Sequence, residues 1–307
     1  MKAAVVHELG QPPAYDEFTD PVAGPGESLV TVTAAALSPL TRARAAGRHY
    51  SSSGGVPFVA GVDGVGRLDD GSRVYFVLPR PPFGAMAERA PAAHCAPVPD
   101  GLDDVAAAAL ANPGMSSWAA YKERAQLQAG ETVLVNGATG ASGQLAVQIA
   151  RHFGAKRIIA TGRNRQALDA LGADLAIPLA DDETTEARFR EEFARGVDVV
   201  VDYLWGRSAE LLLIAAAKAA ERPLRFVQIG AASGGEIALP AAALRARPIA
   251  LMGSGIGSVA LDRLVSCIGE LLAAAPAAGF RLTTQSFPLS EVGSRWGEAG
   301  ARVVFTV

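Results

Sequence analysis

The segment Val133–Ala155, VLVNGATGASGQLAVQIARHFGA, constrains the fold more than any other part of the chain. In it, an apolar run, a knot of small residues and a helix-like stretch follow one another without a gap. The last stretch carries small and apolar side chains at helical spacing, among them Leu145, Ile149 and Phe153. This order predicts a strand, a tight glycine turn and a helix, as at the start of a βαβ unit.

The small residues match the dinucleotide-binding fingerprint as Ala138-x-Gly140-x-x-Gly143, with alanine in the first glycine position. Gly140 would let the backbone approach a pyrophosphate, and Gly143 would let the helix lie against the strand. The helix N-terminus offers N–H groups and a positive dipole end to phosphates. The alternative is a purely structural tight turn. The predicted cofactor contacts are Thr139, Gly140, Ala141, Ser142 and Gly143.

The end of the second expected strand, Thr161–Arg165, indicates which dinucleotide binds. An NAD site places an acidic residue about 20 residues beyond the glycines. This chain has Arg163 and Arg165 there instead, and guanidinium groups can bind a 2′-phosphate. The pattern favours NADPH (NADP+) over NADH, the alternative being an exposed helix start with incidental arginines. The contacts predicted here are Gly162, Arg163, Asn164 and Arg165.

Strand-like and helix-like segments alternate from about Asn112 onward, which predicts an α/β fold. Continuous β-branched runs suit a parallel sheet that is buried on both faces. The first third and the end of the chain are instead rich in short β-prone runs. We expect strands at 132–136, 157–161, 175–179, 197–203, 224–230 and 249–255, and helices at 142–153, 165–171, 208–220 and from about 259.

Length and charge bound the class of protein. A chain of 307 residues favours two domains, and its net charge of −3 without a basic block gives no sign of nucleic-acid binding. No apolar run approaches the ~20 residues that cross a membrane. Cys95 and Cys267 lie far apart, which is typical of a reducing compartment. We therefore expect a soluble cytoplasmic protein that binds neither nucleic acid nor membrane.

Taken together, these segments resemble the medium-chain dehydrogenase/reductase superfamily over essentially the whole chain. The similar parts are MKAAVV at 1–6, the block at 133–161, LGAD at 171–174, and FPLSEV and ARVVFTV near the end. The resemblance implies a GroES-like β-rich catalytic domain at 1–112 and 273–307 and a Rossmann domain, with a doubly wound parallel sheet, at 113–272. It also implies an active site in the cleft between the domains, and a homodimer.

The positions that resemble zinc ligands depart from the alcohol dehydrogenases of this superfamily. Their early cysteine corresponds to Ser38, and their Gly-His-Glu segment to Gly61-Val62-Asp63. The four-cysteine lobe is missing, so we predict no metal site. The resemblance is therefore to the zinc-free branch, which contains quinone oxidoreductase-like (ζ-crystallin-like) enzymes and enoyl reductases. Asp63 is expected to pair with an arginine.

A zinc-free enzyme lacks a Lewis acid, which favours conjugated acceptors over isolated carbonyls. We predict hydride transfer from NADPH to a small-molecule acceptor, either a quinone or an α,β-unsaturated carbonyl compound, with hydrogen-bond donors stabilising the oxygen. A non-catalytic NADPH-binding protein and a zinc-free alcohol or carbonyl reductase stay open as alternatives. No tyrosine begins a Tyr-x-x-x-Lys motif and no Gly-Lys-Ser/Thr follows the glycines, which excludes short-chain dehydrogenases and P-loop enzymes.

Tyr50 corresponds to the tyrosine that enoyl reductases of this branch place near the substrate carbonyl, and is the candidate catalytic residue; otherwise it is a loop tyrosine. Asn112-Pro113-Gly114 resembles a turn beside the nicotinamide, or is a simple interdomain turn. Residues at the carboxyl ends of later strands either line the site or belong to the core. The remaining predicted cofactor contacts are Asn112, Tyr203, Leu204, Gly230, Ala231, Gly253 and Ser254. The predicted acceptor pocket consists of Ser38, Tyr50, Trp205 and Ile256.

Overall fold

A computed structural model describes residues 1–48 and 55–307, which form two compact units. Unit 1 comprises Met1–Asn112 and Val265–Val307, and unit 2 comprises Pro113–Leu264. The chain passes from unit 2 back to unit 1 between Leu264 and Val265, within helix α8 (Leu261–Ala278). This point precedes the domain boundary expected at residue 273. Tyr50 lies outside the described residues, so its predicted catalytic role stays a prediction.

Unit 2 is built on a six-stranded sheet in the order β11-β10-β9-β12-β13-β14, with every neighbouring pair parallel. This is the strand order of a Rossmann fold. Successive strands are added outward from β9 on one side and then, from β12 onward, on the other side. The expected strands are thereby confirmed. Their bounds are Thr132–Asn136 (β9), Arg157–Gly162 (β10), Leu175–Pro178 (β11), Val199–Asp202 (β12), Leu224–Gln228 (β13) and Ile249–Gly253 (β14).

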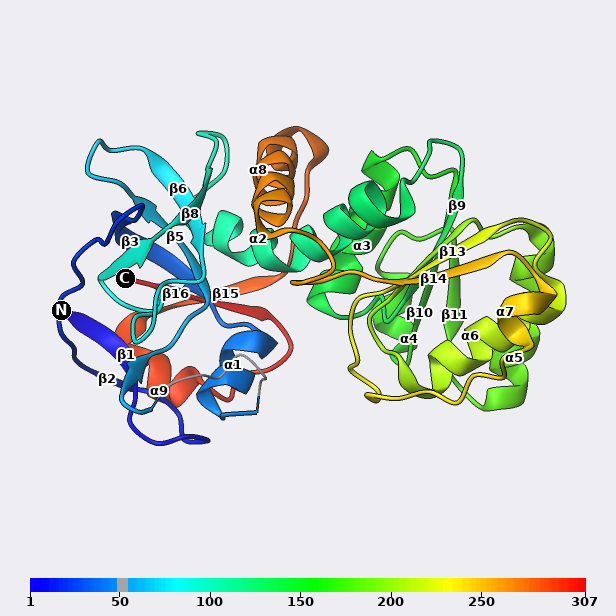
Figure 1. Cartoon of the computed structure of the whole chain (residues 1–307), viewed down its shortest axis with the longest axis horizontal. Helices are drawn as coiled ribbons and strands as arrows, with labels where there is room; N and C mark the ends of the chain where they lie inside the picture. The colour runs from blue at the N-terminus through cyan, green and yellow to red at the C-terminus, as the bar shows by residue number, and fades with distance from the viewer. Residues whose placement is uncertain (49–54) are drawn as a thin grey trace. The chain divides into compact units, whose positions relative to one another are not determined.

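Helices cover both faces of this sheet, with α3 on one side and the pair α5 and α6 on the other (Figure 1). Phe189 and Phe193 of α5 pack with Leu134 and Phe226 of the sheet in one buried cluster. Helix α5 was not predicted, because it buries few residues on one face and is otherwise strongly polar. The α-helices that lie entirely within this unit are α3 (Ala141–His152), α4 (Arg165–Asp169), α5 (Asp182–Arg195), α6 (Gly206–Ala219) and α7 (Ala243–Ala246).

Unit 1 consists mainly of antiparallel β-structure, with a three-stranded sheet β2-β1-β4 and a seven-stranded sheet. In the larger sheet, β16 pairs antiparallel with β3, so the end of the chain returns to the first strands (Figure 1). The strands are β1 (Lys2–Val6), β2 (Ala14–Glu17), β3 (Ser28–Ala36), β4 (Phe58–Val59), β5 (Asp63–Arg67), β6 (Arg73–Val77), β7 (Arg89–Ala92), β8 (His94–Pro97), β15 (Thr284–Pro288) and β16 (Arg302–Thr306).

The segment Asn112-Pro113-Gly114 is not a turn, because it lies inside helix α2 (Asp104–Ala119). A proline within a helix costs roughly 3 kcal/mol. Alanine is the best helix former, and the alanine-rich turn 107–111 that precedes it is almost fully buried, which offsets this cost. A π-helical turn, η1 (Ala120–Ala125), follows directly. Within the described part of the chain, no helix is long and apolar enough to cross a membrane.

Candidate nucleotide and acceptor sites

The two glycines of the fingerprint have different surroundings. A Cβ on Gly143 would lie 2.3 Å from the carbonyl oxygen of Gly137 and 2.6 Å from Cα of Ala138, so helix α3 presses directly on the turn. A Cβ on Gly140 would meet no atom nearer than the Gly137 oxygen, at 4.0 Å. Gly143 is therefore required by packing within the protein, whereas Gly140 leaves open space above the turn.

Helix α3 begins without a capping side chain. Gly140 is its N-cap residue, and the first turn contains no acidic residue. Among the described residues, the N–H groups of Ala141, Ser142 and Gly143 have no hydrogen-bond acceptor. Unpaired N–H groups at a helix N-terminus, together with the helix dipole, favour an anion such as a phosphate. The open space at Gly140, the N-cap residue, directly precedes these N–H groups in the chain.

A buried polar network joins the carboxyl ends of three strands beneath the turn. The amide of Asn136 donates to Asp202 Oδ1 at 2.8 Å and to Ser208 Oγ at 2.9 Å, while Thr161 Oγ1 donates to Asn136 Oδ1 at 2.6 Å. Burial raises the pKa of the Asp202 carboxyl, although hydrogen bonds to it partly oppose this effect. The network holds β9, β10 and β12 in register at the site. Sequence reasoning missed it, although both Asn136 and Asp202 end apolar strands.

The arginines predicted to bind a 2′-phosphate differ in their partners. Arg165 is paired with Asp169, with 2.9 Å between Nε and Oδ2. Asn164 caps helix α4 by accepting from the N–H of Ala167 at 3.0 Å. Arg163 is exposed and makes no hydrogen bond or ion pair to the rest of the described chain. Of the three side chains, Arg163 is therefore the one available for a phosphate.

Gly162, at the end of β10, lies against the glycine turn. A Cβ there would be 2.9 Å from Cγ2 of Thr139, so the two predicted contacts are close neighbours. Leu204 also touches the turn, because a Cβ on Gly137 would be 2.9 Å from its side chain. The end of β12 is thus packed on the same turn as the end of β10.

Tyr203 and Gly230 meet at the ends of β12 and β13. A Cβ on Gly230 would lie 2.8 Å from the carbonyl oxygen of Tyr203. Burial raises the pKa of the Tyr203 phenol to about 12, so it is protonated at neutral pH. Its hydroxyl is 3.3 Å from Oγ of Ser116. The predicted contacts at these two strand ends are therefore brought together in space.

A pocket of about 320 Å³ lies at the same edge of the sheet, and Trp205, Ala231 and Gly253 line it. Trp205 has a φ of +56°, a strained conformation for a residue with a side chain. Its backbone N–H is held by the Asp202 carboxylate at 3.1 Å. Ile256 was predicted in the acceptor pocket but does not line this one, and it is 54% exposed.

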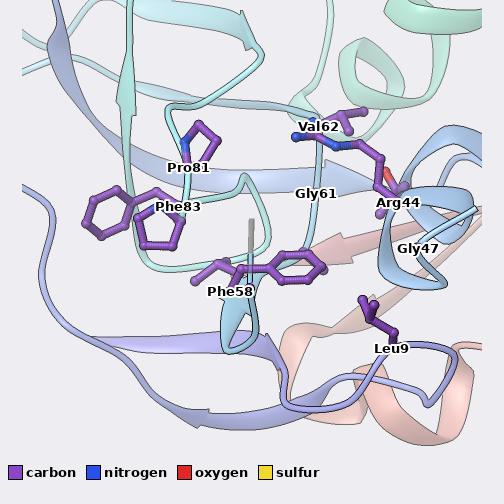
Figure 2. Close-up of a pocket in the computed structure, with 13 residues that line it drawn as sticks. Leu9, Arg44, Gly47, Phe58, Gly61, Val62, Pro81 and Phe83 are labelled. Atoms are coloured by element: carbon purple, nitrogen blue, oxygen red, sulfur yellow. The ribbon is translucent and has the colours of Figure 1, made fainter. Parts of the chain in front are cut away.

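Unit 1 contains a pocket of about 370 Å³ at the end of helix α1 (Pro39–Ala45). Figure 2 shows Pro81 and Phe83 on one side of it and Arg44 on the other, with Phe58 between them. Sequence reasoning missed these side chains, because each is an ordinary residue of a separate segment. The full lining is Leu9, Thr41, Arg44, Gly47, Gly55, Phe58, Val59, Ala60, Gly61, Val62, Pro81, Pro82 and Phe83.

The side chains in the zinc-ligand positions do not fit a zinc ion. Ser38 caps helix α1 by accepting from the N–H of Thr41 at 3.0 Å, and Val62 carries no donor atom. Asp63 is fully buried and accepts from the amide of Asn112. Burial raises the pKa of Asp63, and the charge of Arg302 acts in the opposite direction. Within residues 1–48 and 55–307, no group of three His, Cys, Asp or Glu side chains could hold a metal.

A β-rich unit joined to a Rossmann sheet, with an open glycine turn and an uncapped helix N-terminus, is the architecture of two-domain dehydrogenases and reductases. Residues 141–272 match the family model described as "Zinc-binding dehydrogenase". Over 353 aligned positions, the chain is 31% identical to the "Probable NADPH-dependent quinone reductase tdiC" of Emericella nidulans, covering 99% of each protein.

Further similarity is found to a much longer protein and to a solved structure. The chain is 32% identical to a tenth of the "Mycocerosic acid synthase-like polyketide synthase" of Mycobacterium tuberculosis, a match that spans 67% of the chain. The quinone oxidoreductase of Thermus thermophilus, solved alone and with NADPH, superposes over the whole of both chains with a TM-score of 0.81 at 28% identity. The chain belongs to the medium-chain dehydrogenase/reductase superfamily, in its quinone oxidoreductase-like branch.

Proposed function

We propose that this protein reduces a quinone or an α,β-unsaturated carbonyl compound with NADPH. The observation that carries the proposal is the N-terminus of α3, where three N–H groups have no acceptor among the described residues and the N-cap residue Gly140 has open space around it. This arrangement suits a pyrophosphate. The similarity to quinone reductases described as NADPH-dependent, or solved with NADPH, supports the same conclusion.

The residues of unit 2 fit the cofactor as follows. The N–H groups of Ala141, Ser142 and Gly143 would bind the pyrophosphate, and the exposed guanidinium of Arg163 would bind the 2′-phosphate. Trp205 and Gly253, at the carboxyl ends of β12 and β14, line the pocket that suits the nicotinamide half of NADPH. When bound, NADPH supplies a hydride. The polar network of Asn136 and Asp202 keeps the strand ends in place around it.

The acceptor side of the proposal rests on the pocket of unit 1. Val62 stands where a zinc-dependent relative has a ligand, and it lines this pocket. The oxygen of the acceptor must therefore be stabilised by hydrogen-bond donors. The Thr41 hydroxyl lies 2.9 Å from Ser38 Oγ and is one such donor when Ser38 donates to it. A quinone takes up one hydride and one proton to give a hydroquinone. An enone takes the hydride on its β-carbon and one proton on the resulting enolate to give the saturated carbonyl compound. For the residue that delivers the proton, the sequence predicts Tyr50.

We further propose a homodimer that forms through the edge of the Rossmann sheet. Strand β14 is the last strand of the sheet and pairs with β13 on one side. Within the described chain, its other edge has no partner strand, and Leu251 in it is 37% exposed. Such an edge offers a row of unpaired backbone groups to a second strand.

A panel of acceptors tests the activity. Oxidation of NADPH is followed by its near-ultraviolet absorbance with 1,4-benzoquinone, 9,10-phenanthrenequinone, a 2-alkenal, crotonyl-CoA and a saturated aldehyde, each without enzyme as a control. We expect turnover with a quinone or the alkenal. Tight binding of NADPH with no turnover on any acceptor would instead identify a nucleotide-binding protein, and turnover only on a saturated aldehyde would identify a carbonyl reductase.

A further inference from the structure

The pocket of unit 1 contains one charged side chain in an otherwise apolar lining. Leu9, Phe58, Val62, Pro81 and Phe83 supply aliphatic and aromatic walls. Among the described lining residues, the guanidinium of Arg44 is the sole charge, and Thr41 supplies the sole other polar side chain. Such a pocket suits a ring compound that presents one polar group in a defined direction.

Arg44 has no partner in the described chain, although its neighbours do. No hydrogen bond or ion pair from its guanidinium reaches residues 1–48 or 55–307. By contrast, Arg42, two residues earlier on α1, donates to the carbonyl oxygen of Glu298 at 2.5 Å, and Arg80 pairs with Glu27 at 3.0 Å. Arg44 is therefore not held by the kind of structural contact that occupies other arginines of this unit.

The position of Arg44 places its charge at the pocket rather than in open solvent. Arg44 and Val62 both line the pocket, and Figure 2 shows the Arg44 side chain extending from α1 in the direction of Val62. The side chain is half-buried, and this burial lowers the pKa of Arg44. Arginine nevertheless stays protonated in proteins, so the pocket holds a partly desolvated positive charge without a counter-ion in the described chain.

A charge in this state gains most from an anion that enters the pocket. Partial loss of water weakens the hydration of the guanidinium, and a planar anionic group can restore two charge-assisted hydrogen bonds at once. The apolar walls exclude water from the same contact, which strengthens it. A neutral ring would fill the space between the apolar walls but would bring no negative charge to the guanidinium of Arg44.

Resting on the proposed function, we infer that Arg44 selects acceptors that carry an anionic group, such as a carboxylate, sulfonate or ionised hydroxyl, on a quinone or enone ring. The volume of about 370 Å³ is near the lower end of small-molecule pockets, which are roughly 300–1,000 Å³, and suits one or two rings. Arg44 is a specificity-determining residue in this proposal, and the anion is attached to the ring itself.

Two quinones that differ by one anionic group test the inference. The value of kcat/KM is measured with NADPH for 1,2-naphthoquinone and for 1,2-naphthoquinone-4-sulfonate, and the ratio of the two is compared between enzymes. Comparing the ratio between enzymes cancels any difference in the intrinsic reactivity of the two quinones. Arg44→Met should lower the sulfonate-to-neutral ratio about tenfold to a hundredfold, the range lost with a hydrogen bond to a charged group, mostly through KM. Arg44→Lys should recover part of it.

Arg48→Met is the matched control, because it removes the same charge from an exposed residue that does not line the pocket. It should leave the ratio at its wild-type value. An equal loss on both quinones in Arg44→Met, or an equal change of the ratio in Arg48→Met, would overturn the inference. Thermal unfolding of each variant shows that the fold is retained.

A binding measurement separates this inference from the proposed reaction. Calorimetric titration compares naphthalene-2-sulfonate with its neutral counterpart, naphthalene-2-sulfonamide, in wild type and Arg44→Met. We expect the sulfonate to bind more tightly, and only in wild type. If no quinone is reduced but this preference persists, the proposed reaction fails, and the role of Arg44 in binding anionic ring compounds stands. If quinones are reduced but neither the ratio nor the binding depends on Arg44, the proposed reaction stands and the role of Arg44 fails.

Discussion

Gly140→Ala and Gly143→Ala should separate binding of the nucleotide from folding. A methyl group on Gly143 would lie 2.3 Å from a backbone oxygen and 2.6 Å from a backbone carbon, and neither atom belongs to a side chain that can turn away. Overpacking of this kind costs about 1–3 kcal/mol or more. At Gly140 the nearest atom is 4.0 Å away, and φ is −76°, which alanine adopts without strain.

The expected effects on stability are therefore unequal. Gly140→Ala loses some preference for the N-cap position but reduces the entropy of the unfolded chain, so its free energy of unfolding should stay within about 1 kcal/mol of wild type. Gly143→Ala should be less stable by about 1–3 kcal/mol or more. Urea unfolding followed by circular dichroism measures both free energies.

Gly140→Ala should weaken the binding of NADPH. Its methyl group would occupy the space through which a phosphate approaches the N–H groups of α3, and losing a hydrogen bond to a charged group costs about 1.5–3 kcal/mol. We expect Kd, measured by the fluorescence of NADPH, to rise about tenfold or more. A stable Gly140→Ala protein with wild-type affinity would refute the placement of the pyrophosphate. A Gly143→Ala protein as stable as wild type would refute the close packing at the turn.

Three further predictions concern other parts of the molecule. Arg163→Ala should reduce the preference for NADPH over NADH about tenfold or more in kcat/KM, whereas Arg165→Ala, whose side chain is paired with Asp169, should change it little. Burial raises the pKa of Asp104, but hydrogen bonds from Arg73 and Thr33 lower it more, so its folded-state pKa is below 3.8. The stabilisation by Asp104 is then fully present above its ordinary pKa of 3.8 and is lost as pH falls through the lower folded-state pKa. The difference in free energy of unfolding between wild type and Asp104→Asn should therefore shrink below about pH 4 and stay constant near neutrality. Leu251→Arg should convert a dimer to a monomer in sedimentation velocity, and a wild-type monomer would contradict the proposed edge contact.

The strand, glycine turn and helix of the candidate nucleotide site were predictable because their signals are local. Strand, glycine turn and helix are adjacent in the sequence at 132–153, and each is specified by its own residues. The pairing of Arg165 with Asp169 follows a local rule too, since Asp169 comes four residues later on the same helix, but the sequence analysis instead assigned Arg165 to a phosphate. Helix α5 escaped prediction because its apolar stripe is too thin to show a helical period.

The remaining features depend on contacts between distant segments. Asn136 and Asp202 are 66 residues apart, and nothing near either one indicates that they share a hydrogen bond. The pocket of Arg44 needs Phe58 and Phe83 from separate segments, so no motif marks it. Asn112 was placed in a turn because Asn112-Pro113-Gly114 resembles a turn beside the nicotinamide. The segment is helical instead, because buried packing of the preceding alanines offsets the cost of Pro113 in a helix.

The most direct test of the proposed reaction is its stoichiometry without oxygen, which removes re-oxidation of the product. Purified protein is mixed with NADPH and 9,10-phenanthrenequinone, and loss of NADPH and formation of hydroquinone are recorded together, with NADH in a parallel reaction. We expect one hydroquinone for each NADPH consumed, and much slower consumption of NADH. Saturating binding of NADPH with no loss of it, by this quinone or by any acceptor of the panel, would contradict the proposed function.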